Sequence, residues 1–293
     1  SIGNNAKTND DHDISIGVNA GRSNSGSSRS ITIGTNSRVG DTGYSVNQSI
    51  AIGAGVNPTQ GAWAKGDQSI SIGGNTRSDG HSSVAIGGDD LDLVATQEIS
   101  YVNAEDKRVT GNIKDAMQNL TGINILSPQY SNTMSGHGAV ALGVKAVAGH
   151  LSLAIGTAAT AGAKGSDGNI DYKAVNTVAI GSGATAMLDN AIAIGGGAKA
   201  DDSNPGKKQI GATIKSIQYT WSGGDKIAAR DIVSFGAKGF ERQLKNVAPG
   251  IVSATSTDAV NGSQLYAIAE KTLSKYISIK SDLAGNKSNK GAE

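Results

Sequence analysis

Residues 178–200, VAIGSGATAMLDNAIAIGGGAKA, contain two consecutive copies of a short motif. In each copy two branched apolar residues flank a small one and a glycine follows, as in Val178-Ala179-Ile180-Gly181. Such alternation predicts a short β-strand, because side chains at positions i and i+2 of a strand lie on the same face. We expect the face that carries the two large side chains to be buried.

The motif occurs ten times along the chain, in two blocks. The copies are Ile2-Gly3 (truncated), Ile14-Ser15-Ile16-Gly17, Ile31-Thr32-Ile33-Gly34, Ile50-Ala51-Ile52-Gly53, Ile70-Ser71-Ile72-Gly73, Val84-Ala85-Ile86-Gly87, Val140-Ala141-Leu142-Gly143, Leu153-Ala154-Ile155-Gly156, Val178-Ala179-Ile180-Gly181 and Ile192-Ala193-Ile194-Gly195. Because the chain begins inside a copy, we expect it to be a fragment of a longer protein.

A second signal follows the motif glycine in the later block. Small residues three and five positions after it indicate a second short strand: Ala146 and Ala148, Ala159 and Ala161, Ala184 and Ala186, Ala198 and Ala200. The shortest spacings between motif glycines, 13 or 14 residues, suffice for two short strands and two turns. Longer spacings place extra residues in surface loops. Coils of this kind stack into a solenoid or β-roll, so the predicted fold class is all-β.

The composition favours a thin, repeated core. Glycine accounts for 41 of 293 residues and aromatic residues for 4%, whereas a thick close-packed core needs large side chains. A core of two apolar side chains per coil is marginal for one chain, so we expect an oligomer. We also expect Ile180→Asp to break the head locally, by burying a charge in an apolar strip.

Charge and cysteine content exclude several classes of function. The formal net charge of +1 provides no basic field for nucleic acid and no acidic tail. The absence of cysteine excludes disulfides and thiolate metal sites.

The repeat is interrupted after Gly87 and resumes at Val140. Within the insert 89–137, helical spacing of apolar residues predicts a helix from Thr110 to Leu120, with Gly122 as its C-terminal stop. The apolar residues are Val109, Ile113, Met117 and Leu120. The insert either packs one amphipathic helix on the roll or projects as a recognition element.

From Gln209 the pattern changes again. Residues 210–221 have strand character, and Gly223-Gly224 is suited to a tight turn, with the partner strand returning from Lys226 to Phe235. Trp221 is interpreted either as a packing residue or as a binding aromatic.

A longer motif then follows, with residues 241–250 reading ERQLKNVAPG and residues 257–265 reading TDAVNGSQL. It resembles the neck of trimeric autotransporter adhesins, where three chains cross and narrow from a wide head to a slim stalk. With the S-x-A-I-G repeats, it is similar to a YadA-like head and neck. The resemblance implies a homotrimeric, left-handed parallel β-roll, and it has no counterpart for the insert or for the segment Gln209–Phe235.

Beyond the neck, apolar and small residues spaced alternately four and three apart predict the seam of a parallel coiled coil. They are Leu265, Ala269, Thr272, Tyr276, Ile279 and Leu283. The predicted organisation is β-roll 1–88, insert 89–137, β-roll 138–208, hairpin and last head strand 209–236, neck 237–265 and the start of the stalk 266–293.

No catalytic, cofactor or metal site is predicted. Two GxGxxA stretches, 181–186 and 195–200, imitate a dinucleotide fingerprint, but no helix is predicted to follow either, so both are interpreted as turns. The histidines His12, His81, His137 and His150 lack paired ligand spacing. Asp10, Asp11 and Asp13 form either a solvated loop or a cation contact.

The resemblance implies a bacterial surface adhesin anchored in the outer membrane through a C-terminal anchor outside this sequence. It offers collagen, fibronectin, laminin and immunoglobulin as ligand classes, and the sequence selects none of them. We expect ligand contact at the insert 89–137 and the loop 162–176, because functional variation gathers in loops on a rigid scaffold. The alternatives are a structural trimeric fibre tip of a phage or surface appendage, and a β-helical polysaccharide-acting enzyme.

Overall fold

A computed structural model describes residues 1–8, 12–21, 27–41, 45–127, 132–166, 169–224, 228 and 230–285. The chain divides into two compact units. The first comprises residues 1–207 and 228–242 and contains the stacked coils, and the second comprises residues 208–227 and 243–293. Each is described by itself.

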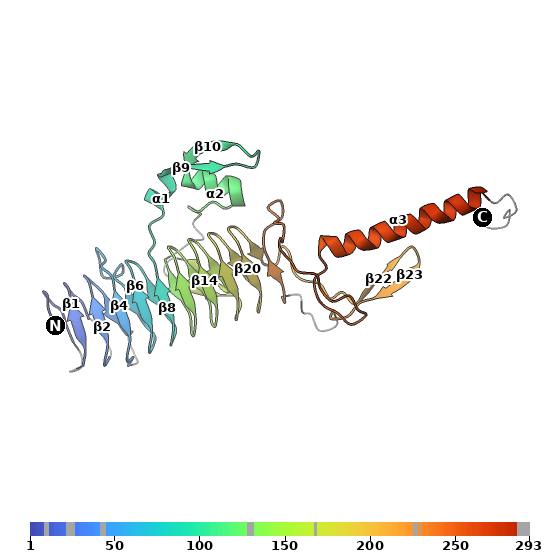
Figure 1. Ribbon diagram of the computed structural model, residues 1–293. Coiled ribbons are helices and arrows are strands. Elements are labelled where there is room, and N and C mark those ends of the chain that lie inside the picture. The colour runs from blue at the N-terminus through green and yellow to red at the C-terminus, as the bar shows by residue number, and fades with distance from the viewer. Residues whose placement is uncertain are drawn as a thin grey trace. The chain divides into compact units, whose positions relative to one another are not determined.

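The apolar motifs form one long parallel sheet whose strands follow each other in sequence order (Figure 1). Its ten strands are β1 (Ile14–Ile16), β2 (Ile31–Ile33), β4 (Ile50–Ile52), β6 (Ile70–Ile72), β8 (Val84–Ile86), β12 (Val140–Leu142), β14 (Leu153–Ile155), β18 (Val178–Ile180), β20 (Ile192–Ile194) and β24 (Val233–Ser234). Equivalent residues pair directly, for example Ala154 with Ala179. The predicted parallel β-roll is confirmed.

The second strand of each coil lies in a separate parallel sheet of eight strands. They are β3 (Arg38–Val39), β5 (Trp63–Ala64), β7 (Arg77–Ser78), β11 (Met134–Ser135), β13 (Val147–Ala148), β15 (Thr160–Ala161), β19 (Thr185–Ala186) and β21 (Lys199–Ala200). In each strand the second residue is buried. The first residue is also buried in β11, β13 and β15, and is only partly buried in the other five strands.

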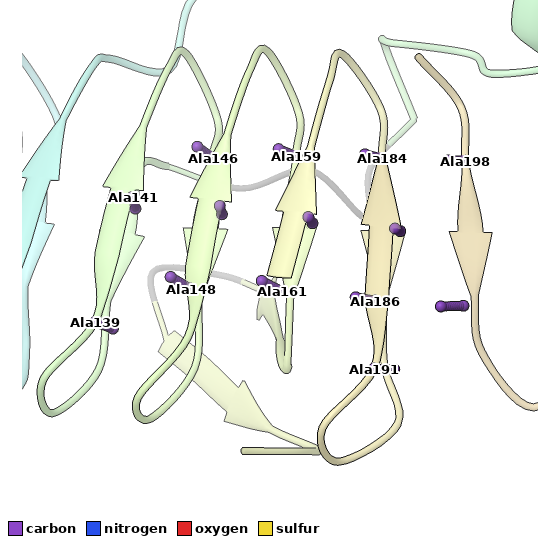
Figure 2. Packing of buried hydrophobic residues seen from close by; sticks show 14 residues of the cluster. Ala139, Ala141, Ala146, Ala148, Ala159, Ala161, Ala184, Ala186, Ala191 and Ala198 are labelled. Atoms are coloured by element: carbon purple, nitrogen blue, oxygen red, sulfur yellow. The ribbon is translucent and has the colours of Figure 1, made fainter. Parts of the chain in front are cut away.

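The expected burial of the large motif residues is wrong for the single chain. The small central residue of each motif is buried instead: Ala179 has no exposed surface, whereas Ile180 beside it is only partly buried. The core of the later coils consists of 14 alanines contributed by both sheets and their turns (Figure 2). The space between the two sheets therefore admits only small side chains, and the branched residues lie on the outer face of the ten-stranded sheet.

The motif glycines allow neighbouring coils to approach closely. Gly181 has a φ of +126°, and a Cβ placed on it would lie 2.6 Å from the carbonyl carbon of Gly195 in the next coil. Gly156 has the same relation to Gly181, at 2.7 Å. Real Cβ atoms do not approach backbone atoms this closely, so both the backbone conformation and the space require glycine.

The insert contains more structure than one helix. It begins with α1 (Asp92–Thr96), continues as an antiparallel hairpin of β9 (Glu98–Val102) and β10 (Arg108–Asn112), and ends with α2 (Ile113–Thr121). Gly122 caps α2 in the left-handed conformation, as predicted. Val109 lies in β10 rather than in the helix, because Asn112 caps the helix N-terminus by accepting the Asp115 N–H at 2.8 Å.

The insert packs on the turns of the later coils through an apolar cluster. Its buried members are Leu91, Ala95, Ile123 and Ile125 from the insert and Ala158 from the roll, with Ile113 and Met117 packed against them. The roll resumes at β11, which pairs with β7 and β13. The insert thus separates the two strands of one coil, and its seat on the roll is apolar.

The segment 209–236 differs from the expected hairpin. The turn lies at Lys215 and Ser216, both with positive φ, between β22 (Gly211–Ile214) and β23 (Ile217–Thr220), rather than at Gly223-Gly224. Residues 226, 227 and 229 of the expected partner strand are outside the described residues. Val233 pairs with Ile192 as the last head strand, so it does not return on the hairpin. Trp221 is 47% exposed in the single chain.

The motif that suggested a neck forms a hydrogen-bonded loop before a single helix, α3 (Gly262–Gly285). The Gln264 side chain accepts the Gly250 N–H at 3.1 Å and donates to the Gly250 carbonyl at 2.6 Å. Asn261 donates to the Val247 carbonyl at 3.0 Å. Leu265, the first seam residue, is 64% exposed in the single chain. The positions of the predicted seam from Leu265 to Leu283 all lie within this helix.

Two neighbouring substitutions test which residue faces the interior. Ala179→Leu should destabilise the roll, because overpacking a close-packed core costs about 1–3 kcal/mol. Ile180→Asp should leave the roll folded, because Ile180 faces outward. Circular dichroism and thermal unfolding of dilute protein distinguish them. Loss of strand structure in Ile180→Asp as complete as in Ala179→Leu would contradict the outward placement of Ile180.

Candidate functional site: a groove on the eight-stranded sheet

A groove of about 790 Å³ lies on the outer face of the eight-stranded sheet. Its floor consists of Thr160, Thr185 and Lys199, which are in direct register on β15, β19 and β21. A hairpin of β16 (Ala163–Ser166) and β17 (Asn169–Tyr172) contributes Lys164, and Lys173 follows it. The hydroxyl and ammonium groups give the floor a polar character.

The groove carries charges of both signs. Its lining includes the cations Lys164, Lys173, Lys199 and Arg230 and the carboxylates Asp189, Asp201 and Asp202. Lys173 is paired with Asp171 at 2.6 Å, and Arg230 lies 3.7 Å from Asp189. Among the described residues, neither Lys164 nor Lys199 forms an ion pair. These two ammonium groups are thus available to an acidic or carbonyl-rich ligand.

The groove lies where the two predicted recognition segments meet. Ile123 of the insert lines it together with Lys164 and Lys173 of the loop 162–176. A Cβ on Gly183 would lie 2.9 Å from Ile123, so the insert rests directly on the turn beside the groove. The sequence indicated the two segments separately, but their common location follows from the stacking of the coils.

Three of the four histidines, which lack paired ligand spacing in the sequence, are brought together by the stacking of the coils. The rings of His81, His137 and His150 stack with centroids 5.0 Å apart, and Tyr172 stacks on His150 at 3.9 Å. Each histidine lies three residues before a motif strand, so the register of the coils superimposes them. That shared offset was the sequence signal for the stack.

Each stacked ring also accepts a backbone hydrogen bond from the preceding coil. Nδ1 of His81, His137 and His150 accepts the N–H of Asp67, His81 and His137 respectively, at 2.9–3.1 Å. Burial lowers the pKa of His137, the positive charges of His150 and His81 lower it further, and Asp79 opposes them. The stack therefore favours the neutral form of His137.

The remaining predicted residues lie in turns of the roll. Asp13 accepts the Ser30 N–H at 2.9 Å, whereas Asp10 and Asp11 lie outside the described residues. The two GxGxxA stretches lead into strands β19 and β21, so the interpretation as turns is confirmed. Within the described ranges, no three histidine or acidic side chains are grouped as metal ligands. No helix in that part of the chain has the length and apolarity that a membrane span needs.

Repeated coils in a parallel roll, followed by a polar loop and a long helix, define a head-and-stalk protein of the β-roll type. Residues 1–20, 64–89, 173–198 and 189–204 match the YadA head domain repeat, and residues 243–288 match the coiled stalk of trimeric autotransporter adhesin. Parts of the chain thus match the head repeat and the stalk of YadA-like trimeric autotransporter adhesins. The head-repeat and stalk domains that these segments match are non-enzymatic.

Individual relatives are similar over parts of the chain. Autotransporter adhesin BtaE of Brucella suis biovar 1 (strain 1330) is 50% identical over 58 residues, which are 20% of this chain and 7% of that adhesin. A C-terminal YadA-like domain from Burkholderia pseudomallei is 24% identical, with a TM-score of 0.35, over 67% of this chain and 73% of that one. The collagen-binding domain of Yersinia adhesin YadA is 22% identical, with a TM-score of 0.35, over 76% and 98%.

The histidine stack predicts a pH-dependent stability. Because the pKa of His137 is lower in the folded chain than the unfolded value of about 6.5, the unfolded chain binds more protons below that pH. Its contribution to stability is complete above about pH 6.5 and decreases as the pH falls through the range between the two pKa values. The unfolding temperature should therefore fall between pH 7.5 and pH 5.

A matched variant separates this effect from other acid-sensitive groups. Asn47 occupies the repeat position equivalent to His137, three residues before its strand, so His137→Asn is compatible with the coil. That variant should lose less stability on acidification than the parent, whereas His12→Asn, outside the stack, should behave like the parent. Identical pH profiles for the parent and His137→Asn would contradict the prediction.

Proposed function

We propose that this chain is the adhesive head and the beginning of the stalk of a bacterial surface protein, which displays it outside the cell as a homotrimer. The observation that carries the proposal is the match to YadA head repeats on stacked coils, followed by the match to an adhesin stalk. In this proposal residues 237–265 form the neck, and outer-membrane anchoring is left to a part of the protein beyond this sequence.

The outer face of the ten-stranded sheet supports the proposed trimer. It carries two rows of branched or leucine side chains, and several are more than a third exposed in the single chain: Ile14, Ile16, Ile86 and Ile194. A long exposed apolar surface of this kind is typical of a protein–protein interface. The exposed Leu265 on α3 is suited to the same symmetric assembly.

Light scattering tests the proposed assembly. The purified chain should give about three times the chain mass of 29.5 kDa. Ile180→Asp should lower the observed mass by placing a charge in the proposed interface. A stable folded monomer at micromolar concentration would exclude the trimer.

The groove on the eight-stranded sheet is the proposed ligand contact. It lies on the sheet opposite the apolar rows, so assembly through those rows leaves the groove accessible. A trimer presents three copies, and simultaneous engagement raises avidity well above the affinity of one site. The family resemblance suggests host matrix proteins, with collagen, fibronectin, laminin and immunoglobulin as the candidates.

Binding to immobilised matrix proteins tests this contact. Replacing residues 90–131 by a short turn should leave the coils folded, because β8 and β11 keep their neighbours on both sides. The double variant Lys164→Ala, Lys199→Ala should weaken binding about tenfold, which corresponds to about 1.4 kcal/mol. Its matched control is Lys107→Ala, Lys114→Ala, because both of these lysines are exposed on the insert away from the groove.

Each outcome has a distinct interpretation. Loss of binding in the groove variant but not in the control supports the groove. Unchanged binding in both the groove variant and the shortened variant would indicate that the remaining surface of the repeats binds the ligand. A folded trimer that binds none of the four candidates would favour the structural fibre tip.

A further inference from the structure

A second pocket lies on the same sheet, on earlier coils, and does not share a residue with the groove. It has a volume of about 380 Å³ and is lined by Arg38, Thr59, Gly61, Trp63, Asn75, Thr76, Arg77 and Asn132. Three of these residues are in direct register on adjacent strands, with Trp63 between Arg38 and Arg77. The outward row of the sheet thus presents an Arg–Trp–Arg ladder to the pocket.

The tryptophan fixes the position of the cations around it. The Arg38 guanidinium carbon lies 3.5 Å from the centre of the Trp63 ring, and the Arg77 guanidinium lies at 6.0 Å from the other neighbouring strand. Trp63 is itself held by a hydrogen bond of 2.6 Å from Nε1 to the Gly40 carbonyl. A guanidinium stacked on an indole keeps its N–H edge available, and that edge matches the two oxygens of a carboxylate or sulfate.

The charges around the ladder are unequal. Lys65 pairs with Asp41 at 2.9 Å and lies 3.7 Å from Asp79, which also pairs with Arg77 at 2.6 Å. Arg38 has no ion pair among the described residues. Three cations therefore face two carboxylates, and the excess positive charge lies on Arg38 at the pocket wall.

Two nitrogen atoms of the ladder are buried without a hydrogen-bond partner in the described part of the chain, Nε of Arg38 and Nε of Arg77. Burial lowers the pKa of Arg38, although Asp41 opposes that effect. Buried charged donors of this kind are costly unless an acceptor reaches them. An anion in the pocket would supply both the missing acceptors and the missing negative charge.

The rest of the lining restricts the class of anion. Thr59, Asn75 and Asn132 add hydroxyl and amide groups, and Trp63 is the only large apolar side chain. Since cations from both neighbouring strands lie over the Trp63 ring, it offers no open face for a nucleobase, and the wall is too polar for a lipid chain. A sugar with an acidic group offers hydroxyl partners to these side chains and an anionic acceptor to the guanidinium groups.

We propose that this pocket binds one acidic sugar residue of a glycan, with its sulfate or carboxylate on the guanidinium edges of Arg38 and Arg77. Such a group occurs in sulfated glycosaminoglycans and in sialylated glycans. The site is independent of the groove proposed for matrix proteins, so either can be present without the other.

Trp63 provides the readout. The chain has two tryptophans, so a Trp221→Phe background makes Trp63 the single indole reporter. Its fluorescence is titrated with a heparin-derived sulfated disaccharide, with N-acetylneuraminic acid, with a neutral disaccharide and with inorganic sulfate at matched ionic strength. We expect a saturable change with one of the two acidic sugars, and the responding sugar identifies the source of the ligand. The neutral sugar should produce no change.

Variants distinguish a binding site from structural packing. Arg38→Met should weaken binding at least tenfold. Arg38→Lys should weaken binding less, because lysine keeps the positive charge but lacks the two parallel N–H donors of the guanidinium group. If Arg38→Met does not fold, Asn132→Asp places a carboxylate at the pocket wall without changing the ladder and should also weaken binding. Lys164→Ala, Lys199→Ala in the groove serves as the matched control and should bind the sugar like the parent.

Three results would overturn the proposal. One is the absence of a saturable response to both acidic sugars by fluorescence and by calorimetry. Another is an equal response to inorganic sulfate, which would indicate an adventitious ion only. The third is unchanged affinity in folded Arg38→Met or Asn132→Asp. None of these results depends on whether the chain binds matrix proteins, so failure here is distinguishable from failure of the adhesin proposal.

Discussion

Neighbouring coils are so close at the end of each motif strand that no side chain fits between them, and the rest of the roll depends on this contact. A Cβ at Gly143, Gly156 or Gly181 would lie 2.6–2.7 Å from the nearest backbone atom of the following coil. With the coils held at strand spacing, equivalent positions are superimposed about 4.8 Å apart. The histidine rings, at 5.0 Å, and the Arg–Trp–Arg ladder both result from that spacing.

The close spacing of the coils also determines which side chains lie inside the roll and which lie on its surface. Alanine, serine and threonine fill the interior of the coils, and Ser15, Thr32 and Ser71 take the central motif position in the early ones. Buried hydroxyls need partners, and they find them in one another or in the backbone: Thr32 donates to Ser15 at 3.1 Å. In the later coils, where this space is filled by alanines, the branched motif residues occupy the outer face of the ten-stranded sheet, where a second chain would bury them.

The sequence predicted the coils, their two strands and the stop of α2 at Gly122, because these depend on local periodicity and on glycine. It did not predict which face is internal. Alternation shows that Val178 and Ile180 share a face with each other and not with Ala179, but it does not say which face is buried. The hairpin β9–β10 was missed because the spacing from Val109 to Ile113 is helical, although Val109 precedes the Asn112 cap. Predicting the groove requires the register between whole coils, and a local sequence pattern does not contain that information.

One repeat position shows how a uniform scaffold acquires different surfaces. Two residues after the motif glycine, the early coils place Asn19 and Asn36, which have positive φ and share a hydrogen bond of 3.2 Å. In the later coils Ala158, Gly183 and Gly197 occupy this position, and the insert lies directly on them. The backbone conformation is left-handed in all five, so only the side chain has changed. Without the asparagine amide, the hydrogen bonds between coils at this position are lost and the turn presents an apolar surface. The insert packs on that surface, which places Ile123 at the edge of the groove. Small substitutions at a turn thus determine where the head carries an insert, while the alanine interior of the coils stays the same.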